Sequence, residues 1–202
     1  MKKIIIFALT MAISVTAPIQ TMAESITQSD VEIQPSEQNI EQIIDEITSE
    51  PHQINSDAIQ NIKEYIIKYF GDLGYDNIEC QKFEYNDENN EDTIRRSSQV
   101  DIFLAPTAKD TTVDGTGENI IVTKKSSTDT TKNLIISAHY DSAEDSVGAN
   151  DNGSGVAAVL ELARILKDTE MPYNIKFILF SGEEKYMLGS SCLLYTSDAA
   201  DD

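Results

Sequence analysis

The chain has 202 residues, and 35 aspartates and glutamates outweigh 15 lysines and arginines to give a formal net charge of −20. This length suffices for one domain with a substantial core, and an apolar content of 40% is ordinary for a globular protein. The acidity favours solubility and makes nucleic acid and anionic membranes poor partners, so no nucleic-acid partner is expected.

Residues 1–23 have the layout of a secretory signal peptide. Two lysines precede an apolar stretch, residues 4–17, that is too short and interrupted for a comfortable membrane span. Small residues at positions −3 and −1 mark a plausible cleavage site after Ala23. We therefore expect a secreted, extracellular protein with no stable membrane association after cleavage, and an uncleaved anchor is the alternative.

Residues 24–50 are expected to be a linker or a pro-segment, since the first part is polar, acidic and without periodicity. Isoleucines at helical spacing predict a short amphipathic helix over residues 40–47, ended by Pro51. A longer apolar stripe predicts a second helix over residues 58–73. His52, between the two, is interpreted as an exposed residue at a helix start.

Segments bounded by polar turns read as strands at 78–85, 98–105 and 118–125. Two further runs, 134–136 and 174–180, lack polar alternation, as strands buried on both faces do. A helical pattern over residues 156–166 separates these runs, so this part predicts a βαβ unit. The predicted fold class is α/β, with a mixed, largely parallel sheet flanked by helices.

Polar residues follow both buried runs, at the strand ends where open α/β sheets bind ligands. His139 and Asp141 are two positions apart, so in an extended segment their side chains point the same way. A carboxylate beside a ligating imidazole can accept its second N–H and raise its basicity. Asp151 opens a loop of small residues before the helix. Each residue alone is also typical of a polar turn.

Glu183 and Glu184 follow the second buried run. Adjacent side chains on an extended backbone diverge, so one carboxylate can bind a metal while the other faces a bound water. Metal-assisted hydrolysis needs this division, because the free carboxylate carries the water's proton to the leaving group. The simpler alternative is a pair of solvated acids. The sequence has no H-E-x-x-H, which excludes a helical single-zinc protease site.

The stretches AHYDS, GANDNGSG and FSGEE, in this order and on these elements, resemble the M28 family of zinc aminopeptidases. The resemblance covers roughly residues 55–190, and the three motifs lie within 137–190. It implies a zinc-dependent exopeptidase fold with two Zn²⁺ ions that polarise the carbonyl and activate water. The implied substrates are peptides, from which the N-terminal amino acid is released.

The resemblance also implies a role for each matched residue. His139 resembles a terminal ligand of one zinc, and Asp141 resembles the carboxylate that supports this histidine. Asp151 resembles the carboxylate that bridges both metals. Glu183 resembles the general base, and Glu184 resembles a ligand of the other zinc. The family often continues GEE with Gly-Leu, whereas this chain continues with Lys-Tyr-Met, which affects the wall of the site but not its ligands.

The family's two remaining ligands, an aspartate and a histidine after GEE, have no counterpart, since the chain's histidines are His52 and His139. Residues 51–191 are therefore expected to be the N-terminal part of a peptidase domain. Residues 192–202, CLLYTSDAADD, fit no element, and their codons can be written to resemble a sequencing-library adapter, so we expect a non-native tail. Such an incomplete chain is expected to be poorly folded and inactive.

Two alternatives stay open. One is a related zinc deacylase or a glutaminyl-cyclase-like enzyme of the same fold, although the complete motifs favour a peptidase. The other is a non-catalytic binding domain that kept the fold and lost its metals. Residue types do not set the preferred N-terminal amino acid, the oligomeric state, or zinc over cobalt or manganese, although nitrogen and oxygen ligands suit zinc.

Overall fold

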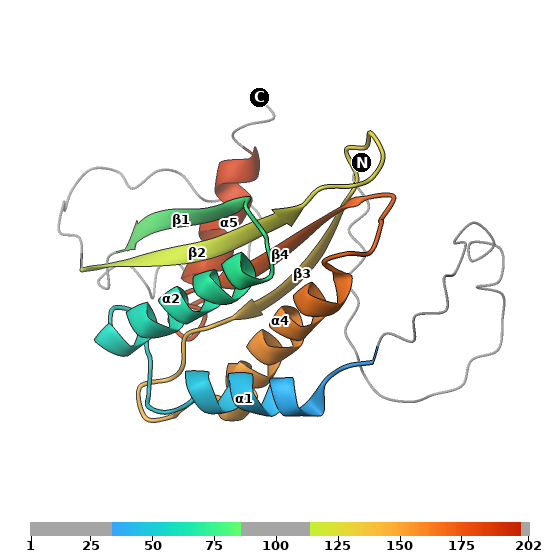
Figure 1. The fold of residues 1–202 in the computed structure, drawn as a ribbon. Helices are drawn as coiled ribbons and strands as arrows, with labels where there is room; N and C mark the ends of the chain where they lie inside the picture. Colours follow the sequence, from blue (N-terminus) through green and yellow to red (C-terminus); the bar gives the residue numbers. More distant parts are fainter. Residues whose placement is uncertain (1–33, 86–113, 199–202) are drawn as a thin grey trace, which may run out of the picture.

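The computed structural model describes residues 34–85 and 114–198 (Figure 1). The signal peptide and the strand predicted at 98–105 lie outside these residues. The elements in chain order are the helices α1 (Glu37–Ile47) and α2 (Asp57–Asp72), the strands β1 (Ile78–Tyr85), β2 (Gly115–Lys124) and β3 (Asn133–His139), the π-helical turn η2 (Ala149–Gly153), helix α4 (Ser154–Leu166), strand β4 (Asn174–Phe180) and helix α5 (Leu188–Asp198).

The four strands form one sheet in the order β1-β2-β4-β3. β3 and β4 pair in parallel through the crossover helix α4, as the βαβ pattern predicts, whereas β2 pairs antiparallel with both β1 and β4. The fold is therefore α/β with a mixed sheet, and the parallel pairing is confined to the βαβ unit in the part described. The register sets His139 beside Phe180, so the polar residues that follow these strands emerge side by side.

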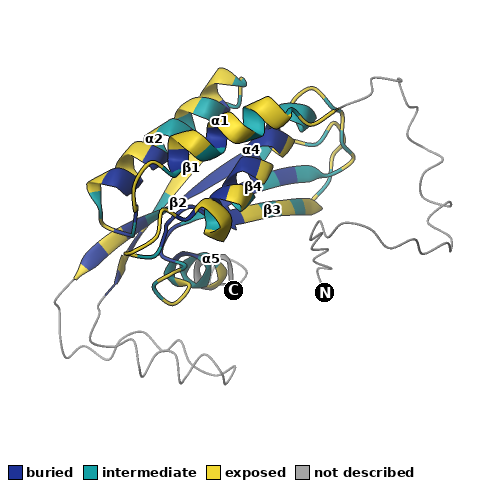
Figure 2. Cartoon of the chain, turned by 90° about the horizontal axis from the view of Figure 1, so that it is seen from below, coloured by how far each residue is buried: buried dark blue, intermediate teal, exposed yellow. Residues whose placement is uncertain are grey.

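Helices α1, α2 and α4 cover one face of the sheet, and α5 lies at the other face next to β1 and β2 (Figures 1 and 2). The hydrophobic core lies between the three helices and the sheet. Phe70 of α2 and Phe177 of β4 are fully buried there, with ring centroids 5.7 Å apart. Each such side chain stabilises the fold by about 1.5–3 kcal/mol relative to an exposed one.

Helix α1 confirms the amphipathic helix predicted from the isoleucine spacing. The hydroxyl of Ser36 accepts the Asn39 N–H at its start, which satisfies a donor that has no partner within the helix. Ile43 and Ile47 are buried in the core. Residues 37–47 thus belong to the folded unit and do not form a free linker. The removal of this region as a pro-segment stays a prediction.

His52 is buried, with 3% of its surface exposed, so its interpretation as an exposed residue is wrong. The backbone between α1 and α2 docks against the loop after β3. The His52 N–H donates to the Ser142 hydroxyl at 2.9 Å, and the Ser142 N–H donates to the His52 carbonyl at 3.3 Å. Helix α5 also differs from expectation, because it extends into residues 192–198, where the sequence predicts no element.

Candidate metal centre

The ring of His139 lies between two aspartates at the carboxyl end of β3. Its Nε2 is 3.0 Å from Asp151 Oδ1. Its Nδ1 is 3.1 Å from the Asp141 carbonyl oxygen and 3.6 Å from the Asp141 carboxylate. Only 10% of the histidine side chain is exposed, so these acidic partners replace most of its water.

Asp141 connects the ends of the two parallel strands. Its side chain is 1% exposed, and its two carboxylate oxygens accept the Glu183 and Glu184 N–H groups, each at 3.1 Å. A buried carboxylate is tolerated where it receives such hydrogen bonds. Asp141 therefore fixes the turn that carries both glutamates against the strand that carries His139.

Asp151 reaches the site through the turn η2. Gly148 has φ 63°, a left-handed conformation that suits glycine, and a Cβ there would lie 2.9 Å from the Ser142 Cβ. The peptide bond from Asp151 to Asn152 is cis. The Asn152 side chain accepts the Gly155 N–H at 3.1 Å and so secures the start of α4. The Asp151 carboxylate is 75% exposed, so it remains accessible to a ligand.

The two glutamates follow a turn at Gly182, where φ is 72°. Glu183 Oε2 lies 3.7 Å from His139 Nε2, and 41% of the Glu183 side chain is exposed. Burial raises the pKa of Glu184 above its ordinary value, and the negative charges of Asp151 and Glu183 raise it further. Negative charge is therefore concentrated beside one imidazole.

The imidazole responds to these charges. Burial alone would lower the pKa of His139, but the hydrogen bond and charge of Asp141, with Glu183 and Asp151, raise it to about 9. A proton on His139 thus offsets part of the surrounding negative charge. A bound cation would supply the same compensation.

The nitrogen and oxygen atoms of the site are of the types that zinc binds, and one pair of them also has the spacing of zinc ligands. Bonds of about 2.0–2.1 Å in tetrahedral geometry place two ligand atoms roughly 3.3 Å apart. The 3.0 Å between His139 Nε2 and Asp151 Oδ1 is close to that spacing, and a nitrogen and oxygen set suits zinc. Among the described residues, however, no three histidine, cysteine or acidic side chains are gathered as an ion would need. The five predicted residues share this end of the sheet, and their roles stay predictions.

Sequence reasoning missed two buried side chains that support this end of the sheet. Asn119 of β2 is fully buried and bonds to the segment that follows β4. The hydroxyl of Tyr140, between His139 and Asp141, donates to the Glu118 carbonyl of β2 at 2.7 Å. The one available signal was the amide of Asn119 directly before the apolar residues Ile120, Ile121 and Val122 of β2.

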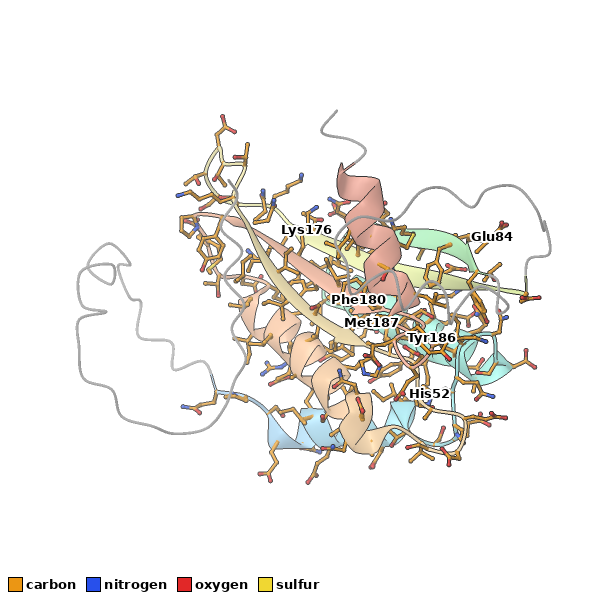
Figure 3. All side chains as sticks on the ribbon, turned by 180° about the vertical axis from the view of Figure 1, so that it is seen from behind. His52, Glu84, Lys176, Phe180, Tyr186 and Met187 are labelled. Carbon is orange, nitrogen blue, oxygen red and sulfur yellow. The ribbon has the colours of Figure 1, made fainter. Side chains whose placement is uncertain are left out.

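The Lys-Tyr-Met stretch forms a turn directly after Glu184, in which Lys185 is half-buried and Tyr186 and Met187, labelled in Figure 3, are exposed. Tyr186 and Met187 both have left-handed backbone conformations, with φ of 68° and 57°. Their side chains are among the exposed large apolar groups, at 52% and 55%. This departure from the family pattern therefore changes the surface beside the glutamates.

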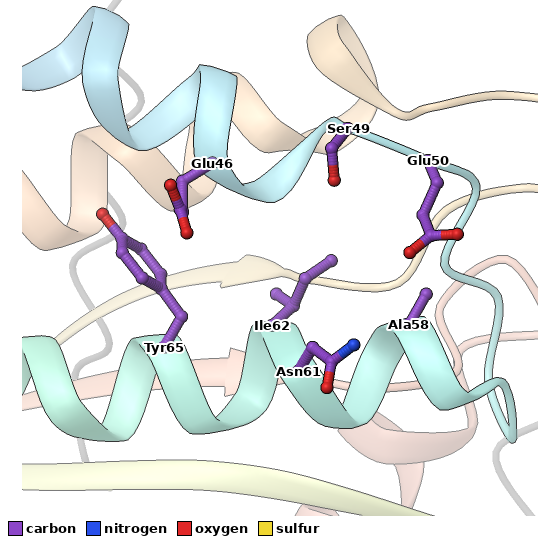
Figure 4. Close-up of a pocket in the computed structure, with 7 residues that line it drawn as sticks. All are labelled: Glu46, Ser49, Glu50, Ala58, Asn61, Ile62 and Tyr65. Carbon is purple, nitrogen blue, oxygen red and sulfur yellow. The ribbon is translucent and has the colours of Figure 1, made fainter.

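A separate pocket lies between α1 and α2 and contains none of the predicted site residues (Figure 4). Its lining residues are Glu46, Ser49, Glu50, Ala58, Asn61, Ile62 and Tyr65.

No described helix is long and apolar enough to span a bilayer.

Comparisons with known proteins indicate a family. Residues 119–201 match the model of peptidase family M28. A vacuolar membrane protease of Schizosaccharomyces japonicus is 31% identical over 149 residues, 73% of this chain and 16% of that protein. Aminopeptidase YwaD of Bacillus subtilis is 47% identical over 77 residues, 38% of this chain and 17% of that protein.

The fold resembles BSAP, a zinc aminopeptidase from Bacillus subtilis, with a TM-score of 0.63 at 18% identity, over 80% of this chain and 65% of that one. The class defined by fold and sequence is thus that of the zinc metallopeptidases. The chain belongs to peptidase family M28. It spans about a sixth of the length of these two sequence relatives. The family match includes residues 192–201, so their assignment to a non-native tail stays a prediction.

Proposed function

We propose that the protein is a secreted zinc aminopeptidase that releases N-terminal amino acids from peptides and uses two zinc ions in its complete domain. The observation that carries this proposal is the meeting of His139 and Asp151, 3.0 Å apart, beside Asp141 and the two glutamates in a chain of family M28. The negative charge around the site also suits the ammonium group at a peptide's amino terminus.

In this proposal His139 and Asp151 would hold one ion, and Asp151 and Glu184 would hold the other. When bound, zinc would lower the pKa of a water molecule and polarise the scissile carbonyl. Asp141 orients His139, because its backbone and side-chain oxygens face Nδ1 and leave Nε2 directed at Asp151. The amides of the glutamate turn hold the Asp141 carboxylate in place.

Glu183 is the general base. Its Oε2 lies 3.7 Å from His139 Nε2. Since 41% of its side chain is exposed, it can also reach substrate and water. Its carboxylate takes a proton from the attacking water as the new C–O bond forms. The same carboxylate delivers that proton to the leaving nitrogen as the C–N bond breaks.

We further propose that the 202 residues alone do not catalyse this reaction. Of the two histidines in the chain, His139 serves the site, whereas the ring of His52 is buried with Nδ1 2.9 Å from the Glu50 carbonyl. Zinc-dependent hydrolysis by the 202-residue chain would contradict this part of the proposal.

The full-length natural protein should be assayed on a panel of aminoacyl p-nitroanilides and on a peptide with N-terminal glutamine. Aminopeptidase activity is expected to release p-nitroaniline and free glutamine, to stop with a chelator and to return with zinc. A glutaminyl-cyclase-like enzyme would instead release ammonia from the peptide and leave a lactam at its first residue. A non-catalytic binding domain would yield neither product.

A further inference from the structure

Residues 181–189, here called the glutamate loop, run from the end of β4 into the first turn of α5 and include Glu183 and Glu184. Backbone bonds close this loop on itself. The Gly189 N–H donates to the Ser181 carbonyl at 3.1 Å, and the Leu188 N–H donates to the Gly182 carbonyl at 2.9 Å. Between the two ends of the loop, the Glu183 and Glu184 N–H groups donate to the Asp141 carboxylate.

One side chain outside the loop bonds to both of its ends. Asn119 Oδ1 accepts the Ser181 N–H at 3.3 Å, and Asn119 Nδ2 donates to the Gly189 carbonyl at 2.8 Å. The second hydrogen of this amide is directed to Gln81 Oε1 on β1, at 2.9 Å. Asn119 therefore ties the base of the glutamate loop to two strands of the sheet.

The fit at this contact is close. Asn119 has no exposed surface, and a Cβ at Gly189 would lie 2.2 Å from its Oδ1 and 2.4 Å from the Ser181 carbonyl. Only a glycine allows α5 to begin so near the amide. A buried amide costs free energy unless it is hydrogen-bonded, and an apolar replacement would leave the Ser181 N–H and the Gly189 carbonyl without this partner.

We propose that Asn119 is a positioning residue that fixes the glutamate loop and, through the amides of Glu183 and Glu184, the carboxylate of Asp141. This inference rests on the proposed function of the same site. The hydrogen bonds of the Asn119 side chain go to Gln81, Ser181 and Gly189, and not to His139 or the glutamate side chains. Its effect on a bound metal is therefore indirect, through the orientation of the residues that hold it.

The test compares Asn119→Ala with Asn39→Ala in the full-length natural protein. Asn39 is a matched control because it also donates from a side-chain amide, to Tyr69 and Glu161, but on the helical side of the sheet. Hydrogen exchange read by mass spectrometry should accelerate within residues 181–189 for Asn119→Ala and within residues 37–47 for Asn39→Ala. This readout does not require a bound metal or any activity.

The second readout is zinc affinity measured by calorimetry. Loss of a residue that orients metal ligands typically weakens binding by about 10- to 100-fold, so this loss is expected for Asn119→Ala and not for Asn39→Ala. Gly189→Ala should cause the same faster exchange and weaker zinc binding, because it disturbs the same contact from the side of the loop. It replaces Asn119→Ala in the test if that variant does not fold.

Unchanged exchange in the glutamate loop, or equal acceleration throughout the protein, would overturn the proposal. Local acceleration with full zinc affinity would also overturn it, since Asn119 would then stabilise the loop without positioning the site. Absence of zinc binding by the unsubstituted protein is a distinct result. It would refute the proposed function, while the exchange data would still show whether Asn119 anchors the loop.

Discussion

At the scale of single residues, the site gathers four carboxylates around one largely buried imidazole. Asp151, Asp141 and Glu183 all contribute to the raised pKa of His139, which reaches about 9 against the opposing effect of burial. Asp141 differs from the others because each of its carboxylate oxygens accepts a backbone N–H. The side chains proposed to bind ions or protons are those of His139, Asp151 and the two glutamates.

Tyr186 gives a stability prediction at this scale. Its φ of 68° lies in the left-handed region, which costs a non-glycine residue roughly 1–2 kcal/mol. Tyr186→Gly is therefore expected to raise the free energy of unfolding by about 1 kcal/mol in urea titrations. Lys185→Gly is the control and should lower it, because Lys185 is not in that region and its ammonium group lies 4.9 Å from the centre of the Tyr85 ring. Equal losses from both substitutions would contradict the prediction.

Sequence reasoning identified the polar residues after the buried strands because strand ends are visible as local patterns. It did not identify the supports of the site. Asn119 bonds to Gly189, 70 positions away, and His52 bonds to Ser142, 90 positions away. Such pairs form only when the sheet brings distant segments together, and neither asparagine nor histidine carries a local signal of its partner.

At the scale of elements, helix α1 is tied to helix α4 by Glu161. The carboxylate accepts the Ser36 N–H and the Asn39 amide, each at 2.6 Å, at the start of α1. Arg164, one turn along α4, donates to both of its oxygens. The Arg164 hydrogen bonds lower the pKa of Glu161 against the opposing effect of burial, and the contacts from α1 lower it further.

Glu161→Gln is expected to reduce the free energy of unfolding by about 1–2 kcal/mol at pH 7, because the charged acceptor is lost. A lowered pKa in the folded state means that the stabilisation is present above the ordinary carboxyl pKa and is lost as the pH falls through the folded value. Urea titrations should therefore show the difference between wild type and variant shrinking in acid. The exposed Glu170→Gln serves as control, and a difference that grows in acid would contradict this account.

The α-helices other than α5 were predictable because their apolar residues follow the helical period, and β3 and β4 were predictable as short apolar runs. The prediction that β3 is buried on both faces is wrong, since Ile135 is 42% exposed. The antiparallel pairing of β2 with both neighbours was not, since strand order depends on contacts between segments far apart in the sequence. Helix α5 escaped prediction because its residues show no continuous apolar face. Leu188 and Cys192 in its first turns pack against the small cluster of Ile54, Phe83 and Tyr85.

At the scale of the whole molecule, the described sheet has β3 at one edge, where Ile135 is 42% exposed. An exposed apolar edge favours association with other chains. This feature supports the expectation from the sequence that the 202 residues alone fold poorly. It is consistent with a chain that covers 65% of the solved aminopeptidase it resembles.

The proposed secretion makes a prediction about the mature chain. When the full-length natural protein is expressed in a bacterium with a secretory pathway, signal removal after Ala23 should leave Glu24 as the first residue in the medium. Intact-mass measurement of the secreted protein checks this position. Recovery of the protein only in the membrane fraction, with residues 1–23 retained, would indicate an uncleaved anchor.

The central claim is that Glu183 is the base of a zinc centre held by its neighbours. The most direct measurement is hydrolysis of an aminoacyl p-nitroanilide by the full-length natural protein carrying Glu183→Gln, together with its zinc content. We predict a loss of about 10²- to 10⁴-fold in kcat with zinc content unchanged. Glu144→Gln, an exposed acid in the loop after β3, should alter neither quantity. Undiminished hydrolysis by Glu183→Gln, or loss of its zinc, would contradict the claim.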